Sequence, residues 1–194
     1  MCIRDRGNHA QGLALTGKLL DIKTTVIMPN EAPIAKQEAT RGYGAEVILE
    51  GDTFNDSRLY MEQMAKETGK TIVHPYDDSE VMAGQGTIGL EILDSIWNVD
   101  TVVLPVGGGG LISGVATALK SFNPNIHIIG VQSENVHGMA TSIEAGKITS
   151  QFTDHTIADG TEVAIPGDKT FEVVDKLVDE FILVSEEELS LIHI

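Results

Sequence analysis

Two kinds of hydrophobic pattern alternate along the chain. Short runs that are apolar at nearly every position predict strands buried on both faces, because a half-exposed strand alternates apolar with polar residues. Between these runs, apolar residues recur at the three-to-four-residue period of an amphipathic helix, as at Tyr60, Met61, Met64 and Ala65. The predicted strands cover residues 24–28, 45–49, 71–74, 101–106, 126–131 and 181–184.

This alternation is typical of βαβ units, so we predict an α/β fold built from mostly parallel sheets. A polar stretch at residues 76–79 follows three such units. The glycine-rich stretch at residues 84–89 then opens a long predicted helix. We therefore expect two open α/β lobes, a small one at residues 1–78 and part of a larger one at residues 79–194.

Composition places the chain among ordinary globular proteins, with 42% hydrophobic and 22% charged residues. Acidic residues outnumber basic ones by 29 to 13, and the net charge of −16 makes a nucleic-acid backbone a poor partner. The longest apolar runs are far short of a membrane span. Cys2 is the single cysteine, which excludes an internal disulfide and favours a reducing, cytoplasmic compartment. We therefore expect no nucleic-acid and no membrane partner.

Four consecutive glycines, at residues 107–110, separate the predicted strand at 101–106 from a predicted helix at 111–122. Glycine loses more backbone entropy on folding than any other residue, so this run indicates that something approaches the backbone closely. Ligands of open α/β sheets bind beyond the carboxyl ends of the strands, and the free N–H groups at a helix N-terminus attract anions. The loop therefore predicts a phosphate site.

The spacing leaves the class of phosphate ligand open. A nucleoside triphosphate loop needs a lysine after its last glycine, but Val115 follows Gly114. Gly108, Gly110 and Gly114 come within one residue of a dinucleotide fingerprint, and Glu134 closes the next predicted strand, where a ribose-binding acid lies. A nicotinamide-dependent oxidoreductase is therefore an alternative. A non-catalytic module that assembles with another chain is a further one.

A second motif, Gly-Asn-His-Ala-Gln-Gly at residues 7–12, precedes a helical pattern. By itself it indicates a capped helix start with turn glycines. It is followed by Ala-Gly-Gln-Gly-Thr at 83–87, Pro-Val-Gly-Gly-Gly-Gly at 105–110 and Ile-Ala-Asp-Gly at 157–160. These motifs, in this order, resemble those of threonine ammonia-lyases (threonine dehydratases), pyridoxal-phosphate enzymes with the fold of the tryptophan synthase β subunit. Serine racemase is a close relative, and the resemblance covers about residues 7–188.

The resemblance implies pyridoxal 5'-phosphate as the cofactor and gives roles to individual residues. Asn8 would donate a hydrogen bond to the phenolic oxygen of the pyridine ring, and the backbone of Gly160 would approach the ring edge. Backbone amides of the glycine run would hold the cofactor phosphate. The residues implied for this role are Gly107, Gly108, Gly109, Gly110 and Leu111.

On the substrate side, the resemblance implies an amino acid, either L-threonine or L-serine. Gly7, Asn8 and His9 would lie in the loop that grips its carboxylate, His9 through its backbone. Arg58 is similar to an arginine that meets the substrate carboxylate in serine racemases, although a solvated arginine at a helix start is the more ordinary state. The family's products are 2-oxobutanoate or pyruvate, with ammonia. The parent enzyme is expected to be a cytoplasmic homo-oligomer of amino-acid metabolism.

The chain departs from the family pattern at several positions. The family's Schiff-base lysine lies upstream of the Gly-Asn-His motif, and none of the nine lysines here has a matching context. We therefore assign no catalytic residue and expect an internal fragment, incomplete at both ends, without turnover by itself. In some relatives a carboxylate binds a divalent cation at the position that aligns with Gln132. Because Gln132 carries an amide there and Glu134 is only nearby, no metal site is assigned. Residues 1–6 and 189–194 do not resemble the family.

Overall fold

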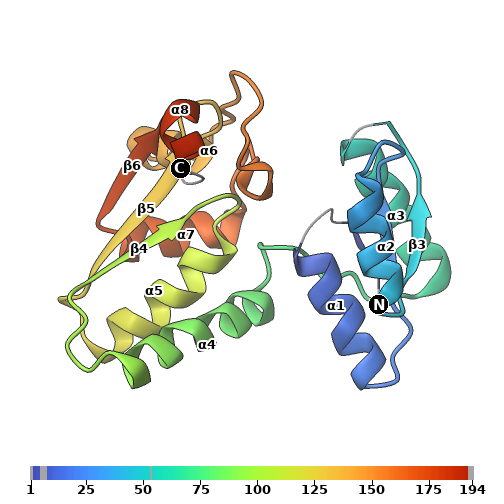
Figure 1. Cartoon of the computed structure of the whole chain (residues 1–194), viewed down its shortest axis with the longest axis horizontal. Helices are drawn as coiled ribbons and strands as arrows, with labels where there is room; N and C mark the ends of the chain where they lie inside the picture. Colours follow the sequence, from blue (N-terminus) through green and yellow to red (C-terminus); the bar gives the residue numbers. More distant parts are fainter. Residues whose placement is uncertain (1, 5–7, 53, 192–194) are drawn as a thin grey trace. The chain divides into compact units, whose positions relative to one another are not determined.

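The computed structural model of the chain is shown in Figure 1, and it describes residues 2–4, 8–52 and 54–191. The chain divides into two compact units, Met1–Pro75 and Tyr76–Ile194, which we call the first and the second unit. Each contains one three-stranded parallel sheet with helices packed on it. The predicted α/β class with parallel sheets is confirmed.

The sheet of the first unit has the strand order β1-β2-β3. Its elements are β1 (Cys2–Arg4), α1 (Asn8–Leu19), β2 (Thr25–Met28), α2 (Ile34–Gly42), β3 (Glu46–Leu49) and α3 (Phe54–Thr68). Alternate residues of β2 enter different cores: Val26 and Met28 pack with Ala10 and Ala14 of α1, whereas Ile27 packs with Met61 of α3. The central strand is therefore buried on both faces, as its continuous apolar sequence predicts.

The prediction of a strand at residues 71–74 is wrong, because only Ile72 forms a bridge and its neighbours form no regular strand. Ile72 still packs against the cluster of Ile27 and Met61, which explains the apolar sequence. Pro75 follows closely and has no N–H to donate to a neighbouring strand. Conversely, β1 is paired in parallel with β2 but was not predicted, since three residues are too few to show a pattern.

The second unit has the strand order β4-β5-β6, and Figure 1 shows α5 and α7 beside this sheet. Its strands are β4 (Thr101–Pro105), β5 (His127–Ser133) and β6 (Glu180–Val184). Its α-helices are α4 (Ser79–Ser95), α5 (Gly110–Phe122), α6 (Gly138–Ala145), α7 (Asp168–Leu177) and α8 (Glu186–Ser190). Leu104 and Ile128 join Val115 and Val174 in the core. The expectation that both sheet faces are buried is wrong for β4, because the helices pack on the Leu104 face and leave Val103 58% exposed.

Helix α4 begins at Ser79, five residues before the predicted start at Gly84. The Asp78 carboxylate caps it by accepting hydrogen bonds from the amides of Glu80 (2.8 Å) and Val81 (3.3 Å). The glycine-rich stretch therefore lies within the helix, where α4 runs alongside α5. A Cβ at Gly89 would lie 2.9 Å from the Cβ of Ala118, so these glycines permit close helix packing.

No helix within the described ranges is both long and apolar enough to cross a membrane.

Candidate functional site

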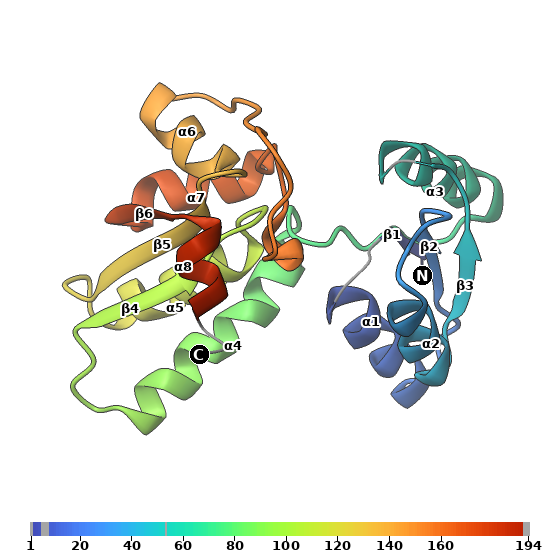
Figure 2. The same ribbon diagram turned by 45° about the horizontal axis from the view of Figure 1, so that its top comes forward.

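The glycine run forms the turn between β4 and α5, as Figure 2 shows. Gly109 is the N-cap residue of α5 and has φ = 94° and ψ = −2°, in the left-handed region that favours glycine. Gly108, Gly109 and Gly110 are buried, and Gly107 is partly buried. This is the strand–loop–helix arrangement that the sequence predicts.

The side-chain positions that these glycines leave empty are occupied by other parts of the second unit. A Cβ on Gly108 would overlap the ring of Tyr76, and a Cβ on Gly110 would lie 2.9 Å from the Cα of Tyr76. A Cβ on Gly107 would lie 3.1 Å from the Cα of Thr161. The close approach that the glycines permit is therefore made by the protein itself, and a ligand at this turn would have to bind through the backbone amides.

The amides of residues 107–112 have no hydrogen-bond acceptor among the described residues. The last amide before them, that of Val106, donates to the carbonyl of Val131 (2.9 Å), and the first after them, that of Ser113, donates to the carbonyl of Gly109 (3.0 Å). Unpaired N–H groups at a helix N-terminus carry partial positive charge. With a left-handed residue at its centre, such a stretch of amides can bind an oxyanion, and a phosphoryl group fits this donor set.

Thr170 of α7 fixes one peptide of this turn. Its side chain is completely buried, and its hydroxyl donates to the carbonyl of Gly108 (2.7 Å) while accepting from the amide of Gly167 (3.1 Å). A trans peptide points its C=O and N–H in opposite directions, so the bond from Thr170 turns the N–H of Gly109 away from α7. The hydroxyl thus helps to keep that amide available.

Asp77 fixes the helix that carries Thr170. Its carboxylate accepts from the amides of Lys169 (2.8 Å) and Thr170 (3.2 Å), and so caps α7 at its first turn. The neighbouring Asp78 caps α4, and Tyr76 lies over the glycine run. Sequence analysis missed these roles of residues 76–78, which it described only as a polar stretch. In the sequence, Asp77 and Asp78 stand directly before a helical pattern, which is a signal for the N-cap of α4 but not for that of α7.

Gly160 differs from the glycines of the turn. It is exposed, and a Cβ built on it would meet no described atom within 4 Å. It lies in a short 3₁₀ helix, η1 (Asp159–Thr161), next to the residue that contacts Gly107. The structure therefore brings the Ile-Ala-Asp-Gly motif to the glycine run, although about fifty residues separate them in the sequence.

The remaining predicted site residues belong to the first unit. Asn8 is the first residue of α1 and is exposed, and His9 is partly buried. Arg58 of α3 forms an ion pair with Glu62 (2.6 Å), and 44% of its side chain is exposed, as for a solvated helix arginine. Gly7 lies outside the described residues.

Gln132 is 2% exposed and has a structural role that explains its amide. Its Nε2 donates to the carbonyl of Val106 (3.1 Å), and its Oε1 accepts from the amide of Ala140 (2.8 Å). It therefore joins the end of β4 to α6. Glu134 is exposed, and within the described ranges no three His, Cys, Asp or Glu side chains are grouped to hold a metal ion.

We expect Gln132→Glu to lower the free energy of unfolding by about 2 kcal/mol, because a buried carboxylate would face the carbonyl of Val106 without a proton to donate. Urea titration followed by circular dichroism measures the change. Gln151→Glu is the control, since Gln151 is only partly buried. A Gln132→Glu variant as stable as the unmodified chain would contradict this role.

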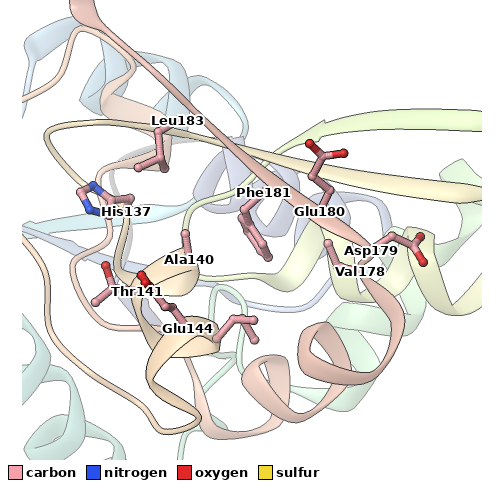
Figure 3. Close-up of a pocket in the computed structure, with 10 residues that line it drawn as sticks. His137, Ala140, Thr141, Glu144, Val178, Asp179, Glu180, Phe181 and Leu183 are labelled. Atoms are coloured by element: carbon pink, nitrogen blue, oxygen red, sulfur yellow. The ribbon is translucent and has the colours of Figure 1, made fainter.

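A pocket elsewhere in the second unit lies between α6 and the segment that enters β6 (Figure 3). Carboxylates of Glu144, Asp179 and Glu180 line it, together with apolar groups such as Phe181. Partial burial raises the pKa of Asp179, but hydrogen bonds from Lys120 and from the amide of Ile128 outweigh this and lower it below its ordinary value. The acidic lining makes this pocket a poor site for phosphate.

A family model described as pyridoxal-phosphate dependent enzyme matches residues 3–190. The chain belongs to this family. The family match decides between the nicotinamide and pyridoxal-phosphate alternatives that the spacing left open, and confirms the cofactor class implied by the four motifs.

The chain is also similar to individual known proteins. Over 183 residues the chain is 72% identical to the L-threonine dehydratase catabolic TdcB of Staphylococcus aureus (strain N315), an alignment that covers 94% of this chain and 53% of the relative. The processed form of threonine deaminase isoform 2 from Solanum lycopersicum is 38% identical with a TM-score of 0.94, over 98% of this chain and 55% of that one. Maize serine racemase is 36% identical with a TM-score of 0.94, over 98% and 57%. The chain thus spans about half the length of the curated relatives it matches.

Proposed function

We propose that this chain is part of a pyridoxal-phosphate-dependent threonine ammonia-lyase and that its second unit holds the cofactor phosphate. The observation that carries this proposal is the row of unpaired amides at residues 107–112, at the N-terminus of α5. The similarity to threonine dehydratase and threonine deaminase supports L-threonine as substrate, and 2-oxobutanoate with ammonia as products, of the whole protein. Serine racemase is the second candidate, favoured by the similarity to the maize enzyme.

The cofactor would be held by the glycine run, by Asn8 and by Gly160. The amides of residues 107–110 and of Leu111 would bind its phosphate, Asn8 its phenolic oxygen, and the backbone of Gly160 its ring edge. The open space beside Gly160 supports this last role, because no described protein atom accounts for the glycine. When bound, pyridoxal phosphate supplies an electron sink for the carbon next to the amino group.

On the substrate side, Gly7, His9 and Arg58 would meet the carboxylate of L-threonine or L-serine. To make that contact, Arg58 would have to give up its ion pair with Glu62. Assembly of the whole protein into a homo-oligomer and its cytoplasmic location remain predictions.

Binding of inorganic phosphate to the isotopically labelled chain tests the phosphate site. We expect phosphate and pyridoxal phosphate to shift the amide resonances of residues 107–112 and to compete for them. Pyridoxal, which lacks the phosphate, controls for reaction of the aldehyde with surface lysines and is expected to leave these amides unchanged. If millimolar phosphate shifts none of them, the phosphate site is refuted.

The product separates the two candidate reactions. A protein that contains this segment and has the length of the curated relatives is incubated with L-threonine or L-serine. Formation of a 2-oxo acid with ammonia supports the ammonia-lyase, whereas formation of a D-amino acid without ammonia supports the racemase.

A further inference from the structure

The loop at residues 151–164 is closed on itself and carries the Ile-Ala-Asp-Gly motif. The amide of Gln151 donates to the carbonyl of Ala164 (3.0 Å), so the two ends of the loop meet. The segment is drawn in orange in Figure 2. Surface loops of this length with joined ends form compact units that are often functional. We call it the 151–164 loop.

This loop meets the glycine run through Thr161. A Cβ on Gly107 would lie 3.1 Å from the Cα and 3.2 Å from the carbonyl oxygen of Thr161. Thr161 is in turn fixed within the loop, because its amide and its hydroxyl both contact the carbonyl of Ala158 (2.9 Å each). The position of the 151–164 loop therefore determines how much space is left beside the Cα of Gly107, the first glycine of the turn.

Glu186, the first residue of α8, joins this loop to the sheet. One carboxylate oxygen accepts from the hydroxyl of Ser133 at the end of β5 (2.6 Å), and the other accepts from the amide of Ile157 (2.8 Å). The hydroxyl of Thr156 also donates to it. One side chain thus holds the loop at the first residue of its motif and fastens it to β5, the neighbour of the strand that leads into the glycine run.

We propose that Glu186 is a positioning residue that holds the 151–164 loop, and with it Thr161 and Gly160, against the glycine run. The proposal deepens the proposed function, because it makes the phosphate site depend on a side chain that does not touch the phosphate-binding amides.

The hydrogen bonds that Glu186 accepts, which we call the anchor, require an ionised carboxylate, because every partner is a donor. Hydrogen bonds from Ser133, Ile157 and Thr156 lower the pKa of Glu186 below its ordinary value of 4.5. Because the pKa is lowered in the folded chain, the anchor is complete above pH 4.5 and is lost as pH falls through the lowered pKa. The elements that Glu186 joins carry other titratable groups. These are Asp154, His155, Asp159 and Glu162 on the loop, His127 at the start of β5, Glu134 after it, and Glu187 and Glu188 on α8.

Glu186→Gln tests the anchor, because its NH₂ group places a donor where one of the two carboxylate oxygens accepts. We expect hydrogen exchange at the amide of Ile157 to become about tenfold faster, since a hydrogen bond to a charged acceptor is lost. The resonance of Gly107 should shift, and phosphate should bind at least about threefold more weakly. Glu187→Gln is the matched control, because Glu187 is the exposed neighbour on the same helix.

The pH profile separates positioning from a general structural role. In the unmodified chain, the amide resonance of Ile157 should shift as the carboxylate of Glu186 is protonated below pH 4.5. This shift should be absent in Glu186→Gln and retained in Glu187→Gln. Unchanged exchange at Ile157, or faster exchange with an unchanged Gly107 resonance, would overturn the proposal. Failure of the unmodified chain to bind phosphate refutes the phosphate site instead, and the exchange and Gly107 readouts still decide on the anchor.

Discussion

Gly109→Ala is expected to lower the free energy of unfolding of the second unit by about 3 kcal/mol. A side chain at φ = 94° costs about 1–2 kcal/mol, because its Cβ crowds the following carbonyl. A Cβ there would also lie 2.9 Å from the Cβ of the fully buried Thr170, and overpacking of a buried site costs about 1–3 kcal/mol. Urea titration measures the loss, followed by amide resonances of the second unit since the two units need not unfold together.

Gly160→Ala is the matched control for this substitution. Gly160 has an ordinary φ, is exposed, and has no described atom within 4 Å of a built Cβ. We expect it to change the free energy of unfolding by less than about 0.5 kcal/mol. Equal stability of the Gly109→Ala and Gly160→Ala variants would show that the turn does not need its left-handed conformation.

Thr170→Val is expected to have the second-largest effect, and it acts on both stability and binding. Valine has the shape of threonine, but it leaves the carbonyl of Gly108 and the amide of Gly167 buried without their partner. We expect a loss of about 2 kcal/mol in the free energy of unfolding. Phosphate affinity should fall about tenfold, because the peptide that presents the N–H of Gly109 is no longer fixed and about 1.4 kcal/mol corresponds to tenfold. Isothermal titration with inorganic phosphate measures the affinity.

Two further variants show whether the hydroxyl of Thr170 is responsible. Thr170→Ser keeps the hydroxyl and should restore most of the phosphate affinity. Thr117→Val removes a threonine hydroxyl of α5 that donates only to the carbonyl of Ser113 one turn earlier (2.7 Å), so it should leave phosphate binding unchanged. If Thr170→Val binds phosphate as tightly as the unmodified chain, the hydroxyl does not orient the turn.

Local patterns in the sequence were enough to predict the order of most elements. The continuous apolar run at β2 and the glycine run before α5 were both interpreted correctly as strand and strand-to-helix turn. The same reasoning failed at residues 71–74, where apolar residues serve packing rather than pairing. It also placed the start of α4 too late, because glycines that serve contact with α5 were interpreted as a helix start.

The supports of the candidate site could not be predicted because they depend on contacts between distant residues. The carboxylate of Asp77 and the amide of Lys169 are 92 positions apart in the sequence, and Thr170 and Gly108 are 62 apart. Nothing local marks Glu186 as different from Glu187, although only the former reaches the 151–164 loop. The motifs therefore predict where the candidate site lies, whereas the side chains that fix the glycine run became apparent only from the fold.

The packing around the glycine run changes what a mutational survey of this loop can reveal. Residues 107–110 are each confined by a neighbour within the second unit, among them Tyr76, Thr161 and Thr170. In a protein of the relatives' length, a library randomised at these four positions and selected only for soluble expression should return glycine as strongly as one selected for the proposed ammonia-lyase activity. Tolerance at Gly160 should differ between the two selections, which makes that position the informative one for separating folding from chemistry.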